Sequence, residues 1–550
     1  MATKELKLVG WGYEGDEITD VERQMVTSRM RERFGGEFEI RKAPGESAIE
    51  LDMPRLSVPP ELSAFATSSK RDRLLHTYGK SYPDYARQFL GDYRNAPDIV
   101  AYARSEADLA AVFEYATRAN AAVIPFGGGT SVCGGVEPVV GSTFNGTISL
   151  DLTRLDRILE VDKTSRAARI QGGIRVPAME NELKSHGLTL RHFPQSMELA
   201  TLGGMIATRS GGHFATLYTH IDDLVESLRT VSPAGITESR RLPGSGAGPS
   251  PDRLMIGSEG SLGIITEAWM RLQARPTFRA GTAVLFEDVF KAAQAVQAIS
   301  QAWLFPANVR LLDSREAFNN GFGDGRQSVV VLAFENADHP VDAWMDRALA
   351  ITRDFGGSFD RDVAKSSSGH RAGAAEAWRN AFIRMPHYKK TIVEMGIITD
   401  TFETAITWER FPAFYTAILS ATEDACLKVT GQKGSVSCRF THCYPDGPAP
   451  YFSFQAKGRH GALAEQWLEI KSRALDAVIA HGGTVRHHHA VGRDHMPWYR
   501  RQRPDLFASA LQGVKDRLDP KGILNPGVLL AAPNLSRPER TLGGVDLDVG

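Results

Sequence analysis

The stretch PFGGGTSVCGG, residues 125–135, directly follows the strand-like run Ala121–Phe126. Three consecutive glycines let the backbone approach a ligand closely with its N–H groups pointing inward, because no Cβ blocks a positive φ. Concave loops of this kind bind anions. The stretch therefore predicts a phosphate or pyrophosphate ligand, and a tight turn without a ligand is the alternative interpretation of the loop alone.

Strand and helix alternate around this loop. A short strand over Ile99–Ala103 leads to Ser105, which forms a helix-capping pair with Asp108. Apolar residues then recur at positions i, i+3, i+4 and i+7, which is typical of an amphipathic helix. The order of strand, helix, strand and glycine loop predicts a compact βαβ unit.

The chain has 550 residues, which is too long for one ordinary core. We expect an α+β protein with five parts. These are a helical N-terminal extension (1–95), a domain that carries the glycine loop (96–276), a second domain with a sheet and helices on one face (277–460), a C-terminal helical segment (461–532) and a loose tail (533–550).

Composition excludes several classes of protein. The chain has 64 basic and 65 acidic residues, so its net charge is near zero and creates no overall positive potential that would indicate nucleic-acid binding. Four cysteines, Cys133, Cys426, Cys438 and Cys443, do not make a disulfide framework in so long a chain. The N-terminus lacks the apolar region of a secretory signal, and no apolar run is long enough to span a membrane. We expect a cytoplasmic protein.

Four further segments carry chemistry. Residues 195–212 are rich in hydroxyl and small side chains, which suit a backbone wrapped around a polar ligand. Gly257–Gly263 is a second glycine loop before a strand, Arg486–Gly492 reads RHHHAVG, and Asp519–Gly527 is rich in turn residues.

In this order the segments resemble the FAD-binding domain of the vanillyl-alcohol-oxidase type of flavoprotein. Within that family the chain is most similar to the alkyldihydroxyacetonephosphate synthases, over about residues 7–530. The motifs that carry this likeness are the triple histidine before Val-Gly, Phe402–Thr404 with Trp408, Cys438–Thr441, Tyr451–Phe454 and Gly10–Tyr13. The resemblance implies a two-subdomain FAD-binding domain and an α+β cap domain for the substrate.

The resemblance also implies the cofactor, FAD, bound noncovalently because no histidine lies near the glycine loop. A dinucleotide fold for NAD would need G-x-G-x-x-G and an acidic residue about 20 positions on, which this loop does not provide. The residues implied to bind FAD are Pro125, Gly127, Gly128, Gly129, Thr130, Ser131, Val132, Gln195, Ser196, Glu198, Thr201, Gly204, Thr208, Arg209, Ser210, Gly257, Ser258, Glu259, Gly260, Leu262 and Gly263.

The triple histidine allows three interpretations. On a strand, adjacent residues point to opposite faces, so His487 and His489 would share one face and His488 would point away. A zinc site would then need a third ligand from elsewhere, so we expect no metal. A cluster without chemistry is the second interpretation. We favour the third, in which His488 and His489 reach the reactive edge of the flavin and His487 belongs to the same catalytic group.

Tyr451 corresponds to the active-site tyrosine of the synthases, a general acid or base, and a core aromatic is the alternative. A phenol with a pKa of about 10 is protonated at neutral pH, so it starts as a proton donor. The synthases carry an arginine 13 residues before Phe402, where this chain has Lys389, with Arg384 nearby. Lysine offers a point charge and not the bidentate fork of arginine. Either Arg384 takes over this role, or the anionic group of the substrate differs from that of the synthases. We expect Lys389, Arg384 and Arg439 to bind substrate.

The resemblance implies a non-redox reaction in which a long-chain alcohol replaces the acyl chain of acyl-dihydroxyacetone phosphate. The alternative is an FAD-dependent oxidase or dehydrogenase of a 2-hydroxy acid or alcohol. In that branch the histidine element reads Gly-Glu-His-Gly-x-Gly, unlike the sequence here. We expect a lipid substrate, no nucleic acid partner, a homodimer and peripheral membrane contact, for which Trp303, Phe305 and the Trp498–Tyr499 pair are candidates.

Overall fold

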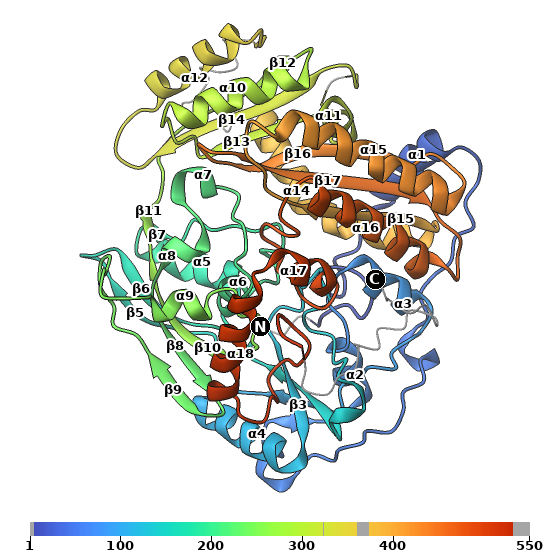
Figure 1. Ribbon diagram of the computed structural model, residues 1–550, viewed down its shortest axis with the longest axis vertical. Coiled ribbons are helices and arrows are strands. Elements are labelled where there is room, and N and C mark those ends of the chain that lie inside the picture. Colours follow the sequence, from blue (N-terminus) through green and yellow to red (C-terminus); the bar gives the residue numbers. More distant parts are fainter. Residues whose placement is uncertain (1–4, 323, 360–372, 532–550) are drawn as a thin grey trace.

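The computed structural model describes residues 5–322, 324–359 and 373–531, so the expected tail at 533–550 lies outside it. Two groups of sheets lie one above the other, with the C-terminal helices beside the junction (Figure 1). Among the described residues, no helix is both long and apolar enough to cross a bilayer.

The glycine loop follows a strand of a small sheet in the lower half. Its strand order is β1 (Ala66–Thr67), β2 (Ile99–Tyr102), β4 (Gly146–Asp151) and β3 (Ala121–Phe126). Helix α4 (Glu106–Ala119) connects β2 to β3, as the sequence predicts. Both strands run parallel to β4, which lies between them. The βαβ unit is therefore present, with a third strand inserted.

A five-stranded antiparallel sheet lies beside it, in the order β5-β6-β10-β8-β9. Its apolar face packs against α5 and α6 in a core of its own. The bounds in this region are β5 Ile158–Asp162, β6 Ala167–Gln171, α5 Val176–Ser185, β7 Leu188–Thr189, α6 Leu202–Ala207, α7 Ala215–Tyr218, α8 Ile221–Leu224, β8 Val225–Ser232, β9 Gly235–Glu238, α9 Pro251–Met255, β10 Ile264–Arg271 and β11 Gln273–Ala274.

The upper half is built on a six-stranded sheet in the order β12-β14-β13-β16-β17-β15. The bounds of its elements are β12 Phe278–Phe286, α10 Val289–Gln301, β13 Asn308–Leu312, α11 Ser314–Asn319, β14 Ser328–Asn336, α12 Asp342–Asp354, α14 Gly373–Glu394, β15 Ile397–Glu403, α15 Phe411–Thr430, β16 Ser435–Cys443, β17 Pro448–Lys457 and α16 Leu463–Ala480.

Helices cover both faces of this sheet, so the expectation of helices on one face is wrong. Val330 and Leu332 of β14 pack into the large core with α10, α12, α15 and α16. Val329 and Val331, which point the other way, pack with residues of α11 and α14. A strand that is buried on both faces carries apolar side chains on both. Its sequence therefore has no polar face that would show which side of the sheet helices cover.

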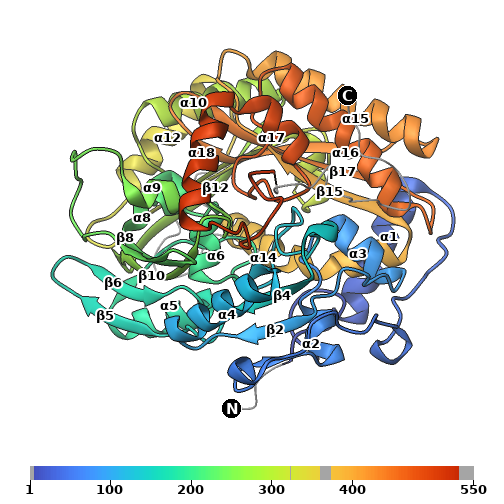
Figure 2. The same ribbon diagram turned by 60° about the horizontal axis from the view of Figure 1, so that its bottom comes forward.

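The N-terminal and C-terminal segments pack against parts of the fold that are distant from them in sequence (Figures 1 and 2). Helix α1 (Asp20–Phe34) packs through Met30 against the start of β15 in the upper half. Helices α2 (Lys70–Leu75) and α3 (Tyr82–Phe89) follow. After α17 (Met496–Gln502), helix α18 (Asp505–Leu518) packs in the core of the five-stranded sheet of the lower half, and Leu524 then bridges to Val123 of β3.

Candidate active site

A cavity of about 650 Å³ lies between the two halves, a size typical of sites for small molecules and cofactors. Its lower wall is the glycine loop with the hydroxyl-rich segment near residue 200, and its upper wall is the face of β15, β16 and β17. Helix α1 and the start of α3 close its side. Segments that are distant in sequence therefore enclose one space.

The glycines are required by close backbone packing. A Cβ on Gly128 would lie 1.9 Å from the carbonyl oxygen of Leu199, and one on Gly127 would lie 2.4 Å from Oγ1 of Thr201. Gly129 has a φ of +63°, which L-residues rarely adopt. The absence of side chains lets the loop lie directly on the 199–201 segment, so the two segments form one cradle with backbone groups at its surface.

The expected cofactor residues divide into two groups. Those that line the cavity are Gly127, Gly128, Gly129, Thr130, Ser131, Val132, Gln195, Ser196, Thr201, Gly204, Thr208 and Ser210. The others are absent from the lining. Glu198 accepts a hydrogen bond from the Trp11 indole at 2.8 Å, and Arg209 pairs with Asp222. Their expected role in binding FAD stays a prediction.

The second glycine loop supports the site from outside the cavity. A Cβ on Gly260 would lie 2.6 Å from Cγ of Pro125, so the two glycine loops touch. Glu259 is buried and accepts hydrogen bonds from the N–H groups of Val491 and Gly492, both at 2.8 Å. Burial raises the pKa of Glu259 to about 7. This carboxyl group ties the FAD-side loop to the end of the histidine segment.

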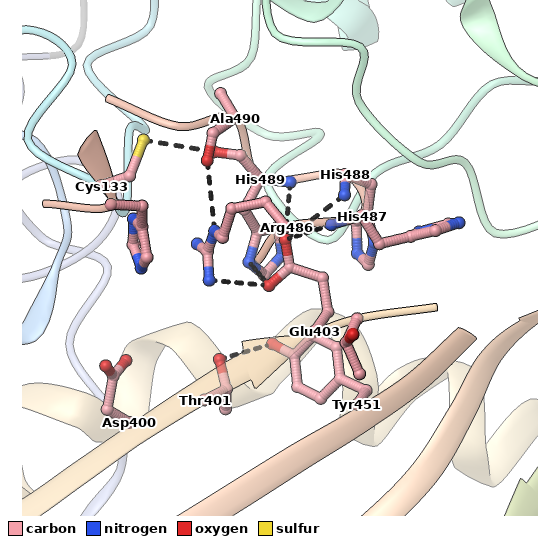
Figure 3. Close-up of polar contacts among 12 residues, drawn as sticks. Cys133, Asp400, Thr401, Glu403, Tyr451, Arg486, His487, His488, His489 and Ala490 are labelled. Carbon is pink, nitrogen blue, oxygen red and sulfur yellow. Dashed lines mark hydrogen bonds and ion pairs between the residues drawn. The ribbon is translucent and has the colours of Figure 1, made fainter. Parts of the chain in front are cut away.

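The histidine segment is a loop and not a strand, so the expected alternation of its side chains is wrong (Figure 3). The reason is Glu403, whose Oε1 accepts the N–H groups of His487, His488 and His489 at 3.4, 3.3 and 2.9 Å. Three successive N–H groups converge on one oxygen, which bends the backbone around it. His488 and His489 both line the cavity as a result, whereas His487 faces the hydroxyl of Tyr444 at 2.7 Å.

Tyr451 lies on the cavity face of the upper sheet, between two residues paired with it across neighbouring strands. Glu403 of β15 is on one side and Arg439 of β16 on the other, and directly paired residues share a face. The phenol oxygen lies 2.9 Å from Oγ1 of Thr401 (Figure 3), and the Arg439 guanidinium lies 4.1 Å from the ring centre. Burial raises the pKa of Tyr451, so its phenol is protonated at neutral pH.

Of the three expected substrate-binding residues, two line the cavity. Lys389 of α14 donates to the carbonyl oxygen of Lys80 at 3.0 Å, and burial lowers its pKa. Arg439 forms an ion pair with Glu316 at 2.6 Å. Arg384 instead pairs with Glu22 of α1 and is absent from the lining.

Sequence reasoning assigned no role in the site to three residues that line the cavity. Lys80, whose ammonium donates to the carbonyl oxygen of Gly10 at 2.8 Å, and Trp11 both line the cavity. His442, at the end of β16, also lines it. Gly10–Tyr13 was noted as a motif, but no local pattern marks Lys80 or His442.

Comparisons with known proteins agree with this geometry. Residues 97–239 match the model of an FAD binding domain, and residues 275–529 match that of the C-terminal domain of FAD linked oxidases. The chain is 30% identical over 492 residues to the alkyldihydroxyacetonephosphate synthase of Dictyostelium discoideum, covering 86% of this chain and 80% of that protein. This chain belongs to the alkyldihydroxyacetonephosphate synthase family.

Two other relatives extend the match. The alkyldihydroxyacetonephosphate synthase of Trypanosoma brucei brucei is 27% identical, covering 97% of this chain and 93% of that protein. A solved alkyldihydroxyacetonephosphate synthase structure, 24% identical, superposes with a TM-score of 0.78, covering 94% of this chain and 98% of that chain. The expected family and fold class are confirmed. FAD is the cofactor of this family, and the cradle of glycines fits it because its backbone N–H groups suit a pyrophosphate.

Proposed function

We propose that the protein replaces the acyl chain of an acyl-dihydroxyacetone phosphate by a long-chain alcohol, without net redox change. The observation that carries the proposal is one continuous cavity, which joins the cradle of Gly127–Val132 to a buried, protonated Tyr451 and to two half-buried lysines, Lys80 and Lys389. When bound, FAD supplies the nucleophile of this exchange, and the protein supplies orientation, charge and proton transfer.

The phosphate of the substrate fits between Lys80 and Lys389. The ammonium of Lys80 donates to the carbonyl oxygen of Gly10, and that of Lys389 donates to the carbonyl oxygen of Lys80, whereas an ammonium has three donors. Burial lowers the pKa of both lysines, that of Lys80 to about 8, and the nearby charge of Lys389 also lowers the pKa of Lys80. An anion between them would relieve that repulsion. Arg439, already paired with Glu316, serves mainly to hold Tyr451.

Tyr451 moves the proton in this proposal. The ester bond between C1 of the substrate and the acyl oxygen breaks, and the phenol gives its proton to the departing oxygen. The resulting phenolate, stabilised by the guanidinium of Arg439, takes the proton of the incoming alcohol as its oxygen bonds to C1. Tyr451 ends as it began, and no electrons are gained or lost. His489, 3.1 Å from Glu403, stands edge-on to the Tyr451 ring and holds it in place.

The alkyl chain fits the end of the cavity that lies between α1 and the upper sheet. Met25, Val26 and Met30 of α1 and Ile392 of α14 line this end. Arg33 closes it through hydrogen bonds to Gln455 and Asn319. The apolar side chains would cover the chain while the reacting carbon stays beside Tyr451.

Peripheral membrane contact also belongs to the proposal, because both substrates are lipids. Trp303 and Phe305 are 64% and 45% exposed and lie side by side, with ring centres 5.5 Å apart. Trp498 is 3% exposed and packs in the core, so the Trp498–Tyr499 pair is not a candidate. The homodimer and the cytoplasmic location expected from the sequence are checked by light scattering and by cell fractionation.

The variant Tyr451→Phe tests the proposed chemistry. It should keep FAD, because Tyr451 lies on the opposite wall from the glycine cradle. The exchange of acyl chain for labelled alcohol should slow by about 10² to 10⁴ fold, as is typical when a proton-transfer group is lost. An unchanged exchange rate with full FAD content would refute the role of Tyr451.

A further inference from the structure

Three histidine rings meet at the edge of the cavity. His442 comes from the end of β16, whereas His487 and His488 come from the loop after α16. The ring centres of His442 lie 5.0 Å from His487 and 5.2 Å from His488, and those two are 5.1 Å apart. One nitrogen from each ring lies within 4.8 Å of the others. The three imidazoles thus form a nearly equilateral triangle.

His442 lacks the partners that a buried imidazole needs. Its side chain is 4% exposed, and neither ring nitrogen has a hydrogen-bond partner among the described residues. Burying a polar group without a partner costs free energy, so such a group points to an absent ligand. Gly211 leaves the space that the ring occupies, because a Cβ there would lie 2.7 Å from its Cε1.

The ligand that fits is a metal cation. Imidazole binds a metal ion in its neutral form, through one ring nitrogen, and histidine is the commonest metal ligand in proteins. Nitrogen donors favour zinc, copper, nickel and cobalt over magnesium or calcium, which prefer oxygen.

The geometry suits a tetrahedral ion. Imidazole nitrogens about 2.0–2.1 Å from a common zinc, at tetrahedral angles, place the ring centres about 5 Å apart. Tyr444 fixes one ligand, because its hydroxyl lies 2.7 Å from Nε2 of His487 and also bonds His220. His487 is thereby left to present Nδ1, which lies 2.9 Å from Nδ1 of His488. Outer partners of this kind orient metal-binding histidines.

We propose that His442, His487 and His488 bind one divalent transition-metal ion of the zinc class. Because His442 and His488 line the cavity, the fourth coordination position opens towards it and takes a water or a substrate oxygen. The sequence alone suggested no metal because the histidine run supplied too few ligands. The third ligand comes from β16, where the pairing with β17 shifts register between Phe440 and His442.

The test measures metal binding on FAD-loaded, full-length protein without a histidine tag. After dialysis against a chelator, Zn²⁺ is titrated and the bound metal is counted by mass spectrometry. Co²⁺ is then bound in its place, because tetrahedral cobalt absorbs visible light and reports its geometry. We expect one ion per chain and a tetrahedral cobalt spectrum.

Two variants and a control make the test specific. His442→Gln should weaken Zn²⁺ binding by more than about 100-fold, since loss of an outer partner alone costs about 10–100-fold. Tyr444→Phe, which removes only a hydroxyl group, should weaken it by about 10–100-fold. His339→Gln, at an exposed histidine, should bind as the parent does. FAD content and melting temperature show whether each variant is folded. If His442→Gln proves unstable, the Zn²⁺ affinity of Tyr444→Phe decides the test.

Less than stoichiometric zinc in the parent, or equal affinity in the parent and the folded variants, would overturn the proposal. Because no substrate is present, such a result leaves the proposed exchange reaction untouched. Conversely, a failed exchange assay does not bear on the metal site.

Discussion

The guanidinium of Arg486 lies 2.9 Å from the carboxylate of Glu403, and the two side chains are 4% and 0% exposed. The same carboxylate accepts the N–H groups of the three histidines that follow Arg486. One side chain of β15 thus fixes the histidine loop relative to Tyr451, its neighbour on β17. The nearby cations hold the pKa of Glu403 well below its ordinary value.

Removing the charge of Glu403 should therefore destabilise the protein. Glu403→Gln keeps the shape but leaves Arg486 buried without a counter-charge, which typically costs about 3–5 kcal/mol. Denaturant unfolding of the FAD-loaded protein measures this loss. Glu469→Gln breaks an exposed pair with Arg473 and should cost less than about 1 kcal/mol. Equal losses of unfolding free energy in the two variants would show that the buried Glu403–Arg486 pair contributes no more to stability than an exposed pair.

FAD binding should depend on the close contact between Gly128 and Leu199. In Gly128→Val, the new side chain meets the Leu199 carbonyl oxygen, so the two walls of the cradle separate and the protein is purified colourless. Gly513→Ala in α18, where a Cβ meets nothing within 4 Å, should keep FAD and gain up to about 1 kcal/mol of stability. Flavin absorbance and denaturant unfolding report both results, and a yellow Gly128→Val protein would contradict the account.

Local sequence patterns predicted local elements well. The strand Ala121–Phe126 has the expected bounds, and Ser105 accepts a hydrogen bond from the N–H of Asp108 as the capping pair predicts. Strands β12 and β13 were missed because alanine, glycine and arginine interrupt their apolar alternation.

The sequence predicted the site residues that belong to a motif and missed those that only the tertiary fold brings into the site. Tyr451 and the histidine loop belong to motifs, and the cavity brings them together. Lys80, His442 and Met30 reach the cavity only through contacts between distant segments. Nothing in the residues adjacent to them in sequence encodes those contacts, so local reasoning had no means to find them.

Anion binding should weaken as pH rises through about 8. The pKa of Lys80 is lowered to about 8, so its ammonium is charged below that pH and neutral above it. Sulfate, which does not titrate in this range, is the probe, and calorimetry between pH 6.5 and pH 9.5 follows its affinity. Lys80→Met should bind weakly at every pH, whereas Lys433→Met, at an exposed lysine, should behave as the parent. A flat pH profile in the parent would exclude Lys80 as the anion site.

Chain-length preference should depend on Met30. Met30→Trp adds bulk at the end of the cavity between α1 and the sheet, so hexadecanol should lose kcat/KM while a short alcohol keeps most of its value. Met53→Trp, at a residue that is 86% exposed, is the control. If both alcohols lose equally in Met30→Trp, the chain does not lie there.

The central claim is that this cavity exchanges chains and does not oxidise its substrate. FAD-loaded protein is incubated without oxygen with acyl-dihydroxyacetone phosphate and labelled hexadecanol, while product and flavin spectrum are followed together. The account predicts labelled ether and free fatty acid in equal amounts, with the flavin spectrum unchanged at the end of the reaction. If no ether forms and a 2-hydroxy acid or an alcohol bleaches the flavin instead, the claim is contradicted and the protein is an FAD-linked dehydrogenase.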